Sequence, residues 1–295
     1  MTQSVWNPKD KLKGKVALVA GGARGAGRGI AEALGEAGAT VYVTGRTTRS
    51  ARSPMNRPET IEETAERVTA KGGNGIAVRV DHSSVDQVKD LIGRIRSEHG
   101  HLHLLVNDIW GGDPLTDWSK TFWEHSLSDG MAVINGVLTT HLNTAYCSAP
   151  LLIESGGGLL IEITDGTDYK YRGNVYYSLA KAAGIHLAAA MAEELKLHGV
   201  AALALTPGFL RSEAMLDHFG VTESNWRQAA AIEPHFIASE TPLFVGRAAA
   251  ALASDPAVMN KSGGAYSSWG LSDEYGFIDA DGSRPHWGNY FATIK

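Results

Sequence analysis

A short apolar run that leads directly into a glycine-rich turn is the feature that most constrains the fold of this chain. Residues 15–20 read Lys-Val-Ala-Leu-Val-Ala, a pattern typical of a strand buried on both faces of a parallel sheet. Five glycines fall within the next nine residues, 21–29, and residues 30–37 are good helix formers that end before Gly38. This order predicts a strand, a tight turn and a helix, which form the first part of a βαβ unit.

Strand-like and helix-like segments alternate along the rest of the chain. We expect strands at residues 15–20, 40–44, 75–80, 103–106, 159–163 and 200–205, and helices at residues 30–37, 59–70, 84–99, 122–152 and 174–197. The alternation predicts an α/β fold, a Rossmann-type doubly wound parallel sheet with helices on both faces. Because the composition shows no break and no internal repeat, we expect a single domain over residues 1–295.

Charge and cysteine content exclude several classes of protein. The formal net charge is −5, so there is no electrostatic reason to expect a nucleic-acid partner. Cys147 is the single cysteine, which excludes an internal disulfide. The first 14 residues are polar and lack the apolar core of a signal peptide, and no apolar run is long enough to cross a bilayer. We therefore expect no membrane span and a cytoplasmic location.

Glycines 21, 25 and 27 occur where the first strand ends and the first helix begins. A backbone without side chains allows close approach of a ligand, and the free N–H groups at a helix N-terminus attract a pyrophosphate. A tight turn that binds nothing could use the same residues. Within a βαβ series, however, the pattern favours nucleotide binding.

Tyr177 and Lys181 stand four residues apart in an Ala-rich helical stretch, so the phenol and the ammonium share one helix face. A lysine beside a phenol favours the phenolate and lowers the pKa of the tyrosine. Tyr177 is then a candidate general acid. Taken alone, such a pair is more often an ordinary surface pair, and only its combination with the glycine-rich turn favours catalysis.

Taken together, these motifs resemble the short-chain dehydrogenase/reductase family over about residues 12–270. Residues 271–282 and the pair Asn174-Val175 look further like its member-1 dehydrogenase/reductase subgroup. The family pattern Thr-Gly-x-x-x-Gly-x-Gly corresponds to residues 20–27, with Ala20 in place of Thr, and the pattern Asn-Asn-Ala-Gly corresponds to Asn107-Asp108-Ile109-Trp110. The pattern Tyr-x-x-x-Lys is matched by Tyr177 and Lys181, and the pattern Pro-Gly by Pro207-Gly208.

The resemblance implies NADPH-dependent reduction of a carbonyl group on a small apolar substrate, reversible as alcohol oxidation. It implies that Tyr177 gives a proton to the substrate oxygen, while Lys181 binds the cofactor ribose and lowers the pKa of the tyrosine. Tyr176 is excluded as the catalytic tyrosine because it lies five residues from the lysine.

Two catalytic positions depart from the family pattern. The family serine, thirteen residues before the tyrosine, corresponds to Thr164, whose hydroxyl can still donate a hydrogen bond, and Asp165 stands next to it. The family's helix asparagine corresponds to Asn135, or to Val137 in a register that differs by two residues. Trp110, where the family has glycine, adds bulk near the cleft.

The end of the second expected strand indicates the cofactor. NAD-binding folds carry an acid there for the ribose 2′-hydroxyl, whereas this chain has Arg46 followed by Thr47, with Arg24 as a second cation in the glycine turn. Both features favour NADP(H). Asp81 resembles the family residue that meets the adenine amino group. The cofactor-binding residues that we expect are Gly21, Arg24, Gly25, Ala26, Gly27, Arg46, Thr47, Asp81, Asn107, Tyr177, Lys181, Pro207, Gly208 and Leu210.

Several further expectations follow. Relatives carry a substrate lid where this chain has residues 211–242, and they form homodimers or homotetramers. We expect local hydrogen bonds at Asp108, Asp113 and Glu162 rather than a catalytic carboxylate pair. No metal is expected, because the spacing of His82, His99, His101, His103 and His141 is not that of metal ligands.

Two alternative functions stay open. One is reduction of a C=C or C=N bond, or of a dedicated biosynthetic intermediate, because Thr164 departs from the family serine. The other is a non-catalytic NADP(H)-binding redox sensor, against which the intact Tyr177 and Lys181 spacing argues.

Overall fold

The structure, a computed structural model, describes residues 6–53 and 55–294 and is built around a seven-stranded sheet. The strand order is β3-β2-β1-β4-β5-β6-β7, and every neighbouring pair is parallel, which confirms the doubly wound α/β fold. The strands are β1 (Val16–Ala20), β2 (Thr40–Gly45), β3 (Asn74–Arg79), β4 (Leu104–Asn107), β5 (Gly158–Ile163), β6 (Val200–Thr206) and β7 (Ala265–Ser267).

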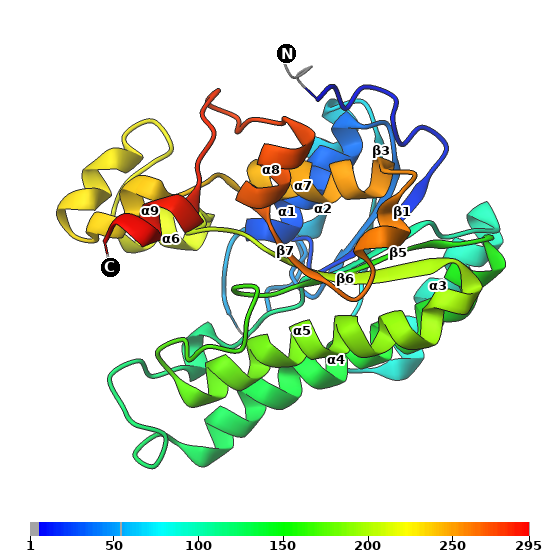
Figure 1. Cartoon of the computed structure of the whole chain (residues 1–295). Coiled ribbons are helices and arrows are strands. Elements are labelled where there is room, and N and C mark those ends of the chain that lie inside the picture. Colours follow the sequence, from blue (N-terminus) through cyan, green and yellow to red (C-terminus); the bar gives the residue numbers. More distant parts are fainter. Residues whose placement is uncertain (1–5, 54, 295) are drawn as a thin grey trace.

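Helices cover both faces of the sheet (Figure 1). Because successive strand residues point to opposite faces, the unbroken apolar run of β1 fills two cores: Ala17 and Val19 pack on one face, Val16 and Leu18 on the other. The helices of the first face are α1 (Gly25–Glu36), α2 (Ile61–Ala70), α7 (Pro242–Ser254) and α8 (Ser268–Tyr275); those of the second are α3 (Val85–His99), α4 (Leu127–Glu154) and α5 (Val175–Leu195).

Two differences from the sequence prediction have local causes. α4 begins at Leu127 rather than at residue 122, because Ser126 is the N-cap and its hydroxyl accepts a hydrogen bond from the N–H of Asp129. β7 was not predicted, since its three residues are too few for a strand pattern, and only pairing with β6 makes it a strand.

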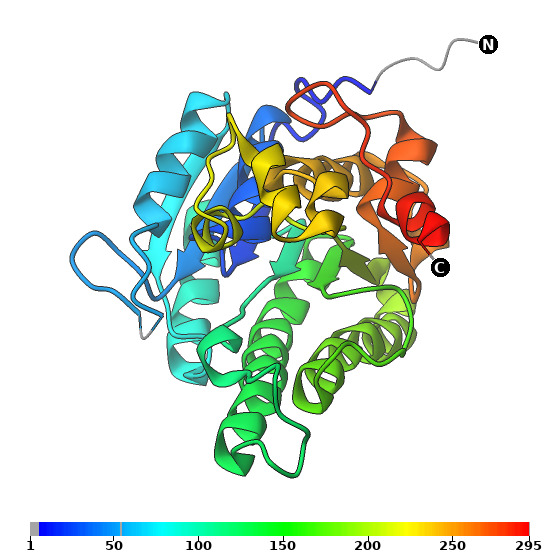
Figure 2. The same cartoon turned by 90° about the vertical axis from the view of Figure 1, so that its left-hand side faces the viewer.

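The chain after β6 folds over the carboxyl ends of the strands. Residues 211–242 include α6 (Glu213–His218) and the short 3₁₀ helices Trp226–Ala231 and Pro234–Ala238, which share a small apolar cluster around Phe236. The C-terminal α9 (Trp287–Thr293) lies beside this segment (Figures 1 and 2). Its Trp287 packs against Phe209, with ring centroids 5.9 Å apart. The remaining 3₁₀ helices are Asp113–Leu115, Lys196–His198 and Val258–Lys261.

Candidate active site

The glycine turn after β1 lies tightly against the end of β4. Gly21 has a φ of 92° and Gly25 a φ of 55°, both in the left-handed region that favours glycine. A Cβ on Gly21 would lie only 2.3 Å from the carbonyl oxygen of Asp108. The turn therefore needs glycine both for its backbone angles and for its contact with β4, and Ala26 follows as a buried residue of α1.

The N-terminus of α1 already binds an anionic group. The N–H of Gly25 donates to Oε2 of Glu213 at 2.8 Å, and Oε1 of the same carboxylate lies 3.2 Å from Nη1 of Arg28. A helix N-terminus that holds a carboxylate also suits a phosphate. The residues of this turn thus fit the pyrophosphate of a dinucleotide. Glu213 comes from α6, and nothing in the sequence pattern indicated this contact.

The two arginines predicted to bind the cofactor differ in their burial and in their contacts. Arg24 is partly buried, and its guanidinium contacts the sulfur of Met55 at 2.7 Å. Burial lowers the pKa of Arg24, against the opposing effect of Glu59. Arg46, just after β2, is exposed and has no hydrogen bond or ion pair within the described residues. It is therefore the cation with the greater freedom to meet a ligand phosphate.

The neighbouring cofactor positions are shaped by local hydrogen bonds. Thr47 is buried, and its carbonyl accepts the N–H of Ile61 at the start of α2. The carboxylate of Asp81, after β3, accepts from the N–H and the hydroxyl of Ser83 at 3.0 and 2.7 Å. These bonds outweigh the effect of burial and lower the pKa of Asp81. The carboxylate is thus ionised and fixed at the edge of the cleft.

Tyr177 and Lys181 meet where the carboxyl ends of β1, β4 and β5 converge. Nζ of Lys181 lies 5.4 Å from the ring centroid of Tyr177 and 4.1 Å from that of Trp110. The expected shared helix face is therefore confirmed. Burial lowers the pKa of Lys181, while the carboxylate of Asp108 opposes that effect. The ammonium is held between two aromatic rings, and the Trp110 that replaces the family glycine supplies one of them.

The hydroxyl of Tyr177 donates to Oδ2 of Asp165 at 3.0 Å. Burial and this carboxylate raise the pKa of Tyr177 well above its ordinary value. The lowered pKa that the sequence suggested is wrong for this arrangement, because Asp165 lies directly at the phenol oxygen whereas Lys181 lies over the ring. Tyr177 is therefore a proton-bearing group.

Thr164 does not reach the phenol. Its N–H continues the ladder to β6, and its buried hydroxyl donates to the carbonyl oxygen of Lys181 at 2.7 Å. Because neighbouring residues of an extended chain point in opposite directions, Asp165 faces Tyr177 instead. The expectation that Thr164 donates to the substrate oxygen is corrected by this geometry, and Asp165 is the polar partner.

Asn135 also differs from the prediction. It lies exposed on α4, whereas Val133 and Val137 on the opposite side of the helix pack with Ala180 of α5. Position 137, the other register considered, therefore faces α5 and the site. The relay asparagine has no counterpart at Asn135, because the helix turns that side chain away.

A buried network missed by the sequence analysis supports the end of β4. The Nδ2 group of Asn107 donates to Glu162 at 2.8 Å, and the other oxygen of Glu162 bonds Nδ1 of His141 at 2.5 Å. Nε2 of His141 bonds the carbonyl oxygen of Ile109 at 3.1 Å. Both partners of the imidazole are acceptors, so both ring nitrogens donate and His141 is an imidazolium. Burial lowers the pKa of His141, but Glu162 more than offsets this, and the pKa ends above its ordinary value.

Asp108 lies between the glycine turn and Lys181. A Cβ on Gly27 would come within 2.9 Å of its Oδ2. Burial raises the pKa of Asp108 to about 6, although the positive charge of Lys181 acts in the other direction. Through these contacts, Asp108 joins the glycine turn to the reaction site.

The turn after β6 rests on a buried carboxyl group. The N–H of Gly208, which follows Pro207, donates to Oε2 of Glu240 at 2.9 Å, and the hydroxyl of Ser268 donates to the same oxygen at 2.6 Å. Burial raises the pKa of Glu240 to about 8. Leu210 lies opposite Glu240 in a short parallel bridge. These contacts fix the predicted Pro-Gly segment at the carboxyl edge.

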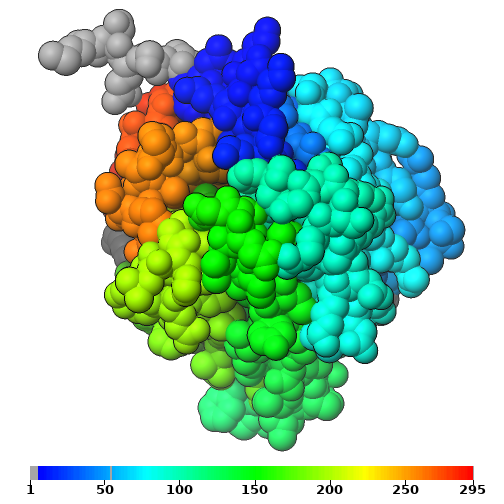
Figure 3. All heavy atoms as spheres, turned by 90° about the vertical axis from the view of Figure 1, so that its right-hand side faces the viewer, coloured from blue at the N-terminus to red at the C-terminus, as the bar shows by residue number. Residues whose placement is uncertain are grey.

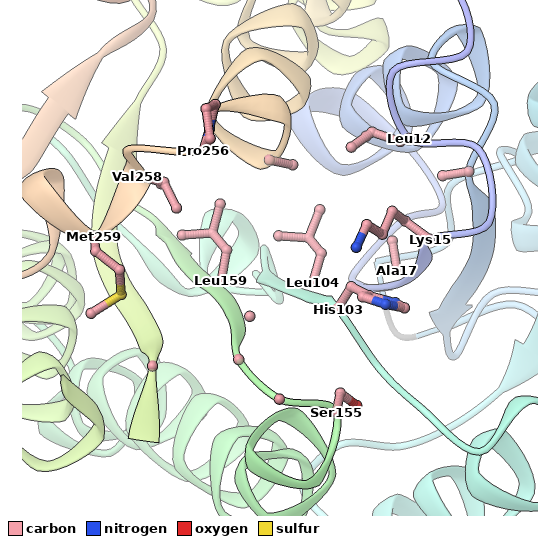
Figure 4. A pocket seen from close by; sticks show the side chains of 16 residues that line it. Leu12, Lys15, Ala17, His103, Leu104, Ser155, Leu159, Pro256, Val258 and Met259 are labelled. Carbon is pink, nitrogen blue, oxygen red and sulfur yellow. The ribbon is translucent and has the colours of Figure 1, made fainter. Parts of the chain in front are cut away.

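A cavity of about 340 Å³ lies at the other edge of the sheet and is unrelated to this chemistry. Lys15, His103 and Leu159 line it near the amino ends of β1, β4 and β5 (Figure 4). Figure 3 shows the side of the molecule where the blue N-terminal segment and the green region before β5 lie. Because Tyr177 and Lys181 are at the carboxyl ends, this cavity contains none of the predicted site residues.

Residues 6–53 and 55–294 contain neither a candidate metal centre nor a candidate membrane span. They contain no group of three or more His, Cys, Asp or Glu side chains placed to hold a metal ion. No helix in the same ranges combines the length and the apolar character that crossing a membrane requires.

Comparison with known sequences identifies the relatives of the chain. The sequence pattern of the family described as short chain dehydrogenase matches residues 15–219. The dehydrogenase/reductase SDR family member 1 proteins of Mus musculus and Homo sapiens are 35% and 34% identical, each over 93% of this chain and 85% of its own length. An NADPH-dependent aldehyde reductase-like chloroplastic protein of Arabidopsis thaliana is 30% identical over 72% of this chain and 79% of its own.

Solved structures share the fold at low sequence identity. A short chain dehydrogenase of Mycobacterium thermoresistibile superposes with a TM-score of 0.77 at 20% identity, covering 94% of this chain and 92% of its own. A 7α-hydroxysteroid dehydrogenase complexed with NADH and a 7-oxo bile acid reaches 0.70 at 23% identity, covering 94% and 97%. The pattern match and the extent of the member 1 similarity show that the chain belongs to the short-chain dehydrogenase/reductase family and, within it, to the member 1-like group.

Proposed function

We propose that this oxidoreductase reduces the carbonyl group of a small, largely apolar compound with NADPH, and catalyses the reverse alcohol oxidation. The observation that carries the proposal is the meeting of the Tyr177 phenol and the Lys181 ammonium at the carboxyl ends of the strands, beside the glycine turn. A protonated phenol is a suitable general acid for an oxygen that gains negative charge. The exposed ring of Trp118, 5.0 Å from that of Tyr177, offers an apolar wall for the substrate.

Each half of the site has a distinct role in this proposal. When bound, the reduced nicotinamide supplies the hydride that a carbonyl carbon accepts. The N–H of Gly25 binds a phosphate of the cofactor after Glu213 withdraws, Lys181 binds the ribose, and Tyr177 gives its proton to the substrate oxygen. Asp165, rather than Thr164, is the polar group at the phenol oxygen of Tyr177.

The preference for NADP(H) rests on charge. Arg46 stands where an NAD-binding fold would carry an acid, and it forms no ion pair within the described part of the chain. A guanidinium binds a phosphate through charge-assisted hydrogen bonds. The name of the Arabidopsis relative, an NADPH-dependent aldehyde reductase-like protein, supports this choice.

We also propose that single-domain subunits of this chain form a cytoplasmic homodimer or homotetramer. Exposed apolar side chains on α4, among them Met131, Leu142 and Tyr146, support such an interface. Sedimentation at several protein concentrations tests the assembly, and a monomer at all concentrations would contradict it.

The decisive test of the function is turnover. The purified chain is mixed with NADPH and a series of apolar ketones and aldehydes, and the loss of absorbance from the reduced nicotinamide is followed. We expect oxidation of NADPH that depends on the carbonyl compound. Binding of NADPH without any turnover over the whole series would favour the redox sensor instead, and turnover with C=C or C=N compounds alone would favour the other reductases.

A further inference from the structure

The carboxylate of Asp165 makes the reaction site unusual. It accepts a hydrogen bond from the Tyr177 hydroxyl at 3.0 Å, and it has no other hydrogen bond or ion pair within the part of the chain that the structure describes. A carboxylate is a stronger hydrogen-bond acceptor than a neutral carbonyl oxygen. A simple ketone therefore has to take the phenol proton away from a better acceptor, which makes such a ketone a poor match for the site.

A substrate that brings its own donor to Asp165 would release the phenol, and the surroundings favour a donor with positive charge. A second carboxylate, Asp113, is held by Nε1 of Trp110 at 2.6 Å, and both carboxylates raise the pKa of Tyr177. The ring of Trp118 is more than half exposed beside the phenol and has no cation over it among the described residues. Carboxylates and open aromatic faces together bind ammonium groups.

The two nearby cations, Lys181 and Arg172, leave the carboxylate of Asp165 available to a substrate. Nζ of Lys181 lies over the ring of Trp110, and the charges of Asp108 and, to a lesser extent, Asp165 raise its pKa against the effect of burial. Lys181 forms no ion pair with either carboxylate within the described residues. Arg172 is turned toward Asp168, with Nη2 at 3.3 Å from Oδ1, and bonds the carbonyl oxygen of the same residue. Within the described residues, Asp165 thus accepts a hydrogen bond from the Tyr177 hydroxyl alone and forms no ion pair.

We propose that the substrate is an amino ketone or amino aldehyde, in which the carbon next to the carbonyl carbon carries a protonated amino group, and that Asp165 selects it. This inference rests on the carbonyl reduction proposed above. The ammonium binds Asp165, and the freed phenol of Tyr177 hydrogen-bonds the carbonyl oxygen. The carbon then accepts the hydride from NADPH, the C=O π electron pair moves to the oxygen, and the oxygen takes the Tyr177 proton. The products are an amino alcohol and NADP⁺, and the phenolate regains its proton from solvent.

The test compares three ketones with one carbon skeleton: the amino ketone, its N-acetyl derivative and the ketone without nitrogen. In the wild type we expect kcat/KM for the amino ketone to exceed that for both neutral ketones at least tenfold, because a charge-assisted hydrogen bond contributes about that factor. Asp165→Asn should remove the preference for the amino ketone over both neutral ketones, mainly through KM for the amino ketone. Asp86→Asn removes the same charge from an exposed position on α3 and should retain the preference. Equal kcat/KM for the three ketones in the wild type, or an undiminished preference in Asp165→Asn, would overturn the inference.

Binding separates this inference from the proposed function. Quenching of tryptophan fluorescence gives Kd for the amino alcohol and its N-acetyl derivative in the presence of NADP⁺. Tighter binding of the amino alcohol, by tenfold or more and lost in Asp165→Asn, supports the ammonium site even when no ketone is turned over. Equal Kd values for the two ligands overturn it even when simple ketones are reduced.

Discussion

The two halves of the carboxyl edge are built in different ways. The half formed by β1 and α1 is a backbone structure, in which positive φ angles and close contacts require glycine at positions such as Gly21. The half around Tyr177 is made of side chains from three separate segments, since Trp110 from the loop after β4, Asp165 from the loop after β5 and Lys181 from α5 converge on the phenol. Backbone requirements are readable from residue types, whereas side-chain convergence depends on directions that only the fold determines.

The largest effect should come from the reaction half. Tyr177→Phe deletes the proton donor with little change in volume, so we expect kcat to fall by at least ~10²-fold, within the ~10²–10⁴-fold that general acid catalysis contributes. Kd for NADPH should change little. Carbonyl-dependent oxidation of NADPH and cofactor titration give the two quantities.

Tyr176→Phe is the matched control for that variant. The hydroxyl of Tyr176 donates to the carbonyl oxygen of Phe122 at 3.1 Å, away from the Tyr177 hydroxyl, so its loss should leave turnover within a few-fold of the wild type. If Tyr177→Phe were as active as Tyr176→Phe, Tyr177 would not be the general acid of the reaction.

The comparison also explains which predictions from the sequence held. Alternation of apolar runs and helices was sufficient for the parallel sheet, because β1, β4 and β6 are buried on both faces and leave few other arrangements. The glycine turn was equally readable. β7 was not, because three residues carry no period and its pairing with β6 depends on the whole fold.

Errors in the site came from the direction of side chains. Thr164 and Asp165 are neighbours, and only their places at the end of β5 decide which one faces Tyr177. Asn135 is two residues from Val137, which on a helix is enough to move from the exposed to the buried side. Glu162 and His141 come from β5 and α4, and no sequence spacing links them.

The next prediction tests whether the buried pair supports the reaction half. Glu162→Gln leaves the imidazolium of His141 without its counter-ion, and breaking a buried ion pair costs about 3–5 kcal/mol of unfolding free energy. Urea unfolding measures this loss. Glu154→Gln is the control, because its pair with Arg96 is half exposed and should contribute less than about 1 kcal/mol.

The same variant should change the pH dependence of stability. The pKa of His141 is raised in the folded chain, so its contribution is fully present below the unfolded value of about 6.5 and is lost as the pH rises through the higher folded value. In Glu162→Gln this fall in stability above about pH 6.5 should weaken. An unchanged pH profile and unchanged stability would mean that the pair does not support the end of β4.

A smaller effect is expected in the cofactor half, where Arg46 has no hydrogen bond or ion pair among the residues that the structure describes. Arg46→Asp replaces attraction for a 2′-phosphate with repulsion, so Kd for NADPH should rise about tenfold or more, since one charge-assisted hydrogen bond contributes roughly 1.5–3 kcal/mol. Kd for NADH should stay the same or fall. Arg52→Asp makes the same change of charge in the same loop, where Arg52 contacts Asn56, and should leave the ratio of the two Kd values unchanged. Equal wild-type affinities for NADPH and NADH would show that Arg46 does not bind the 2′-phosphate.

The smallest effect should appear where the two halves are joined by the segment 211–242. Glu213 occupies the N–H of Gly25, so a cofactor phosphate has to displace its carboxylate, and Glu213→Gln should lower Kd for NADPH by up to about fivefold, as the ~0.3–1 kcal/mol for an anion at a helix N-terminus implies. Calorimetric titration measures the change. Asp217→Asn is the control, because this carboxylate on the same helix pairs with Arg57 and not with the turn. If Glu213→Gln weakened NADPH binding instead, the carboxylate would help to hold the cofactor rather than compete with it. A gain in affinity would mean that cofactor binding at the glycine turn, which the sequence predicts, is limited by Glu213, a side chain 188 residues away in the sequence.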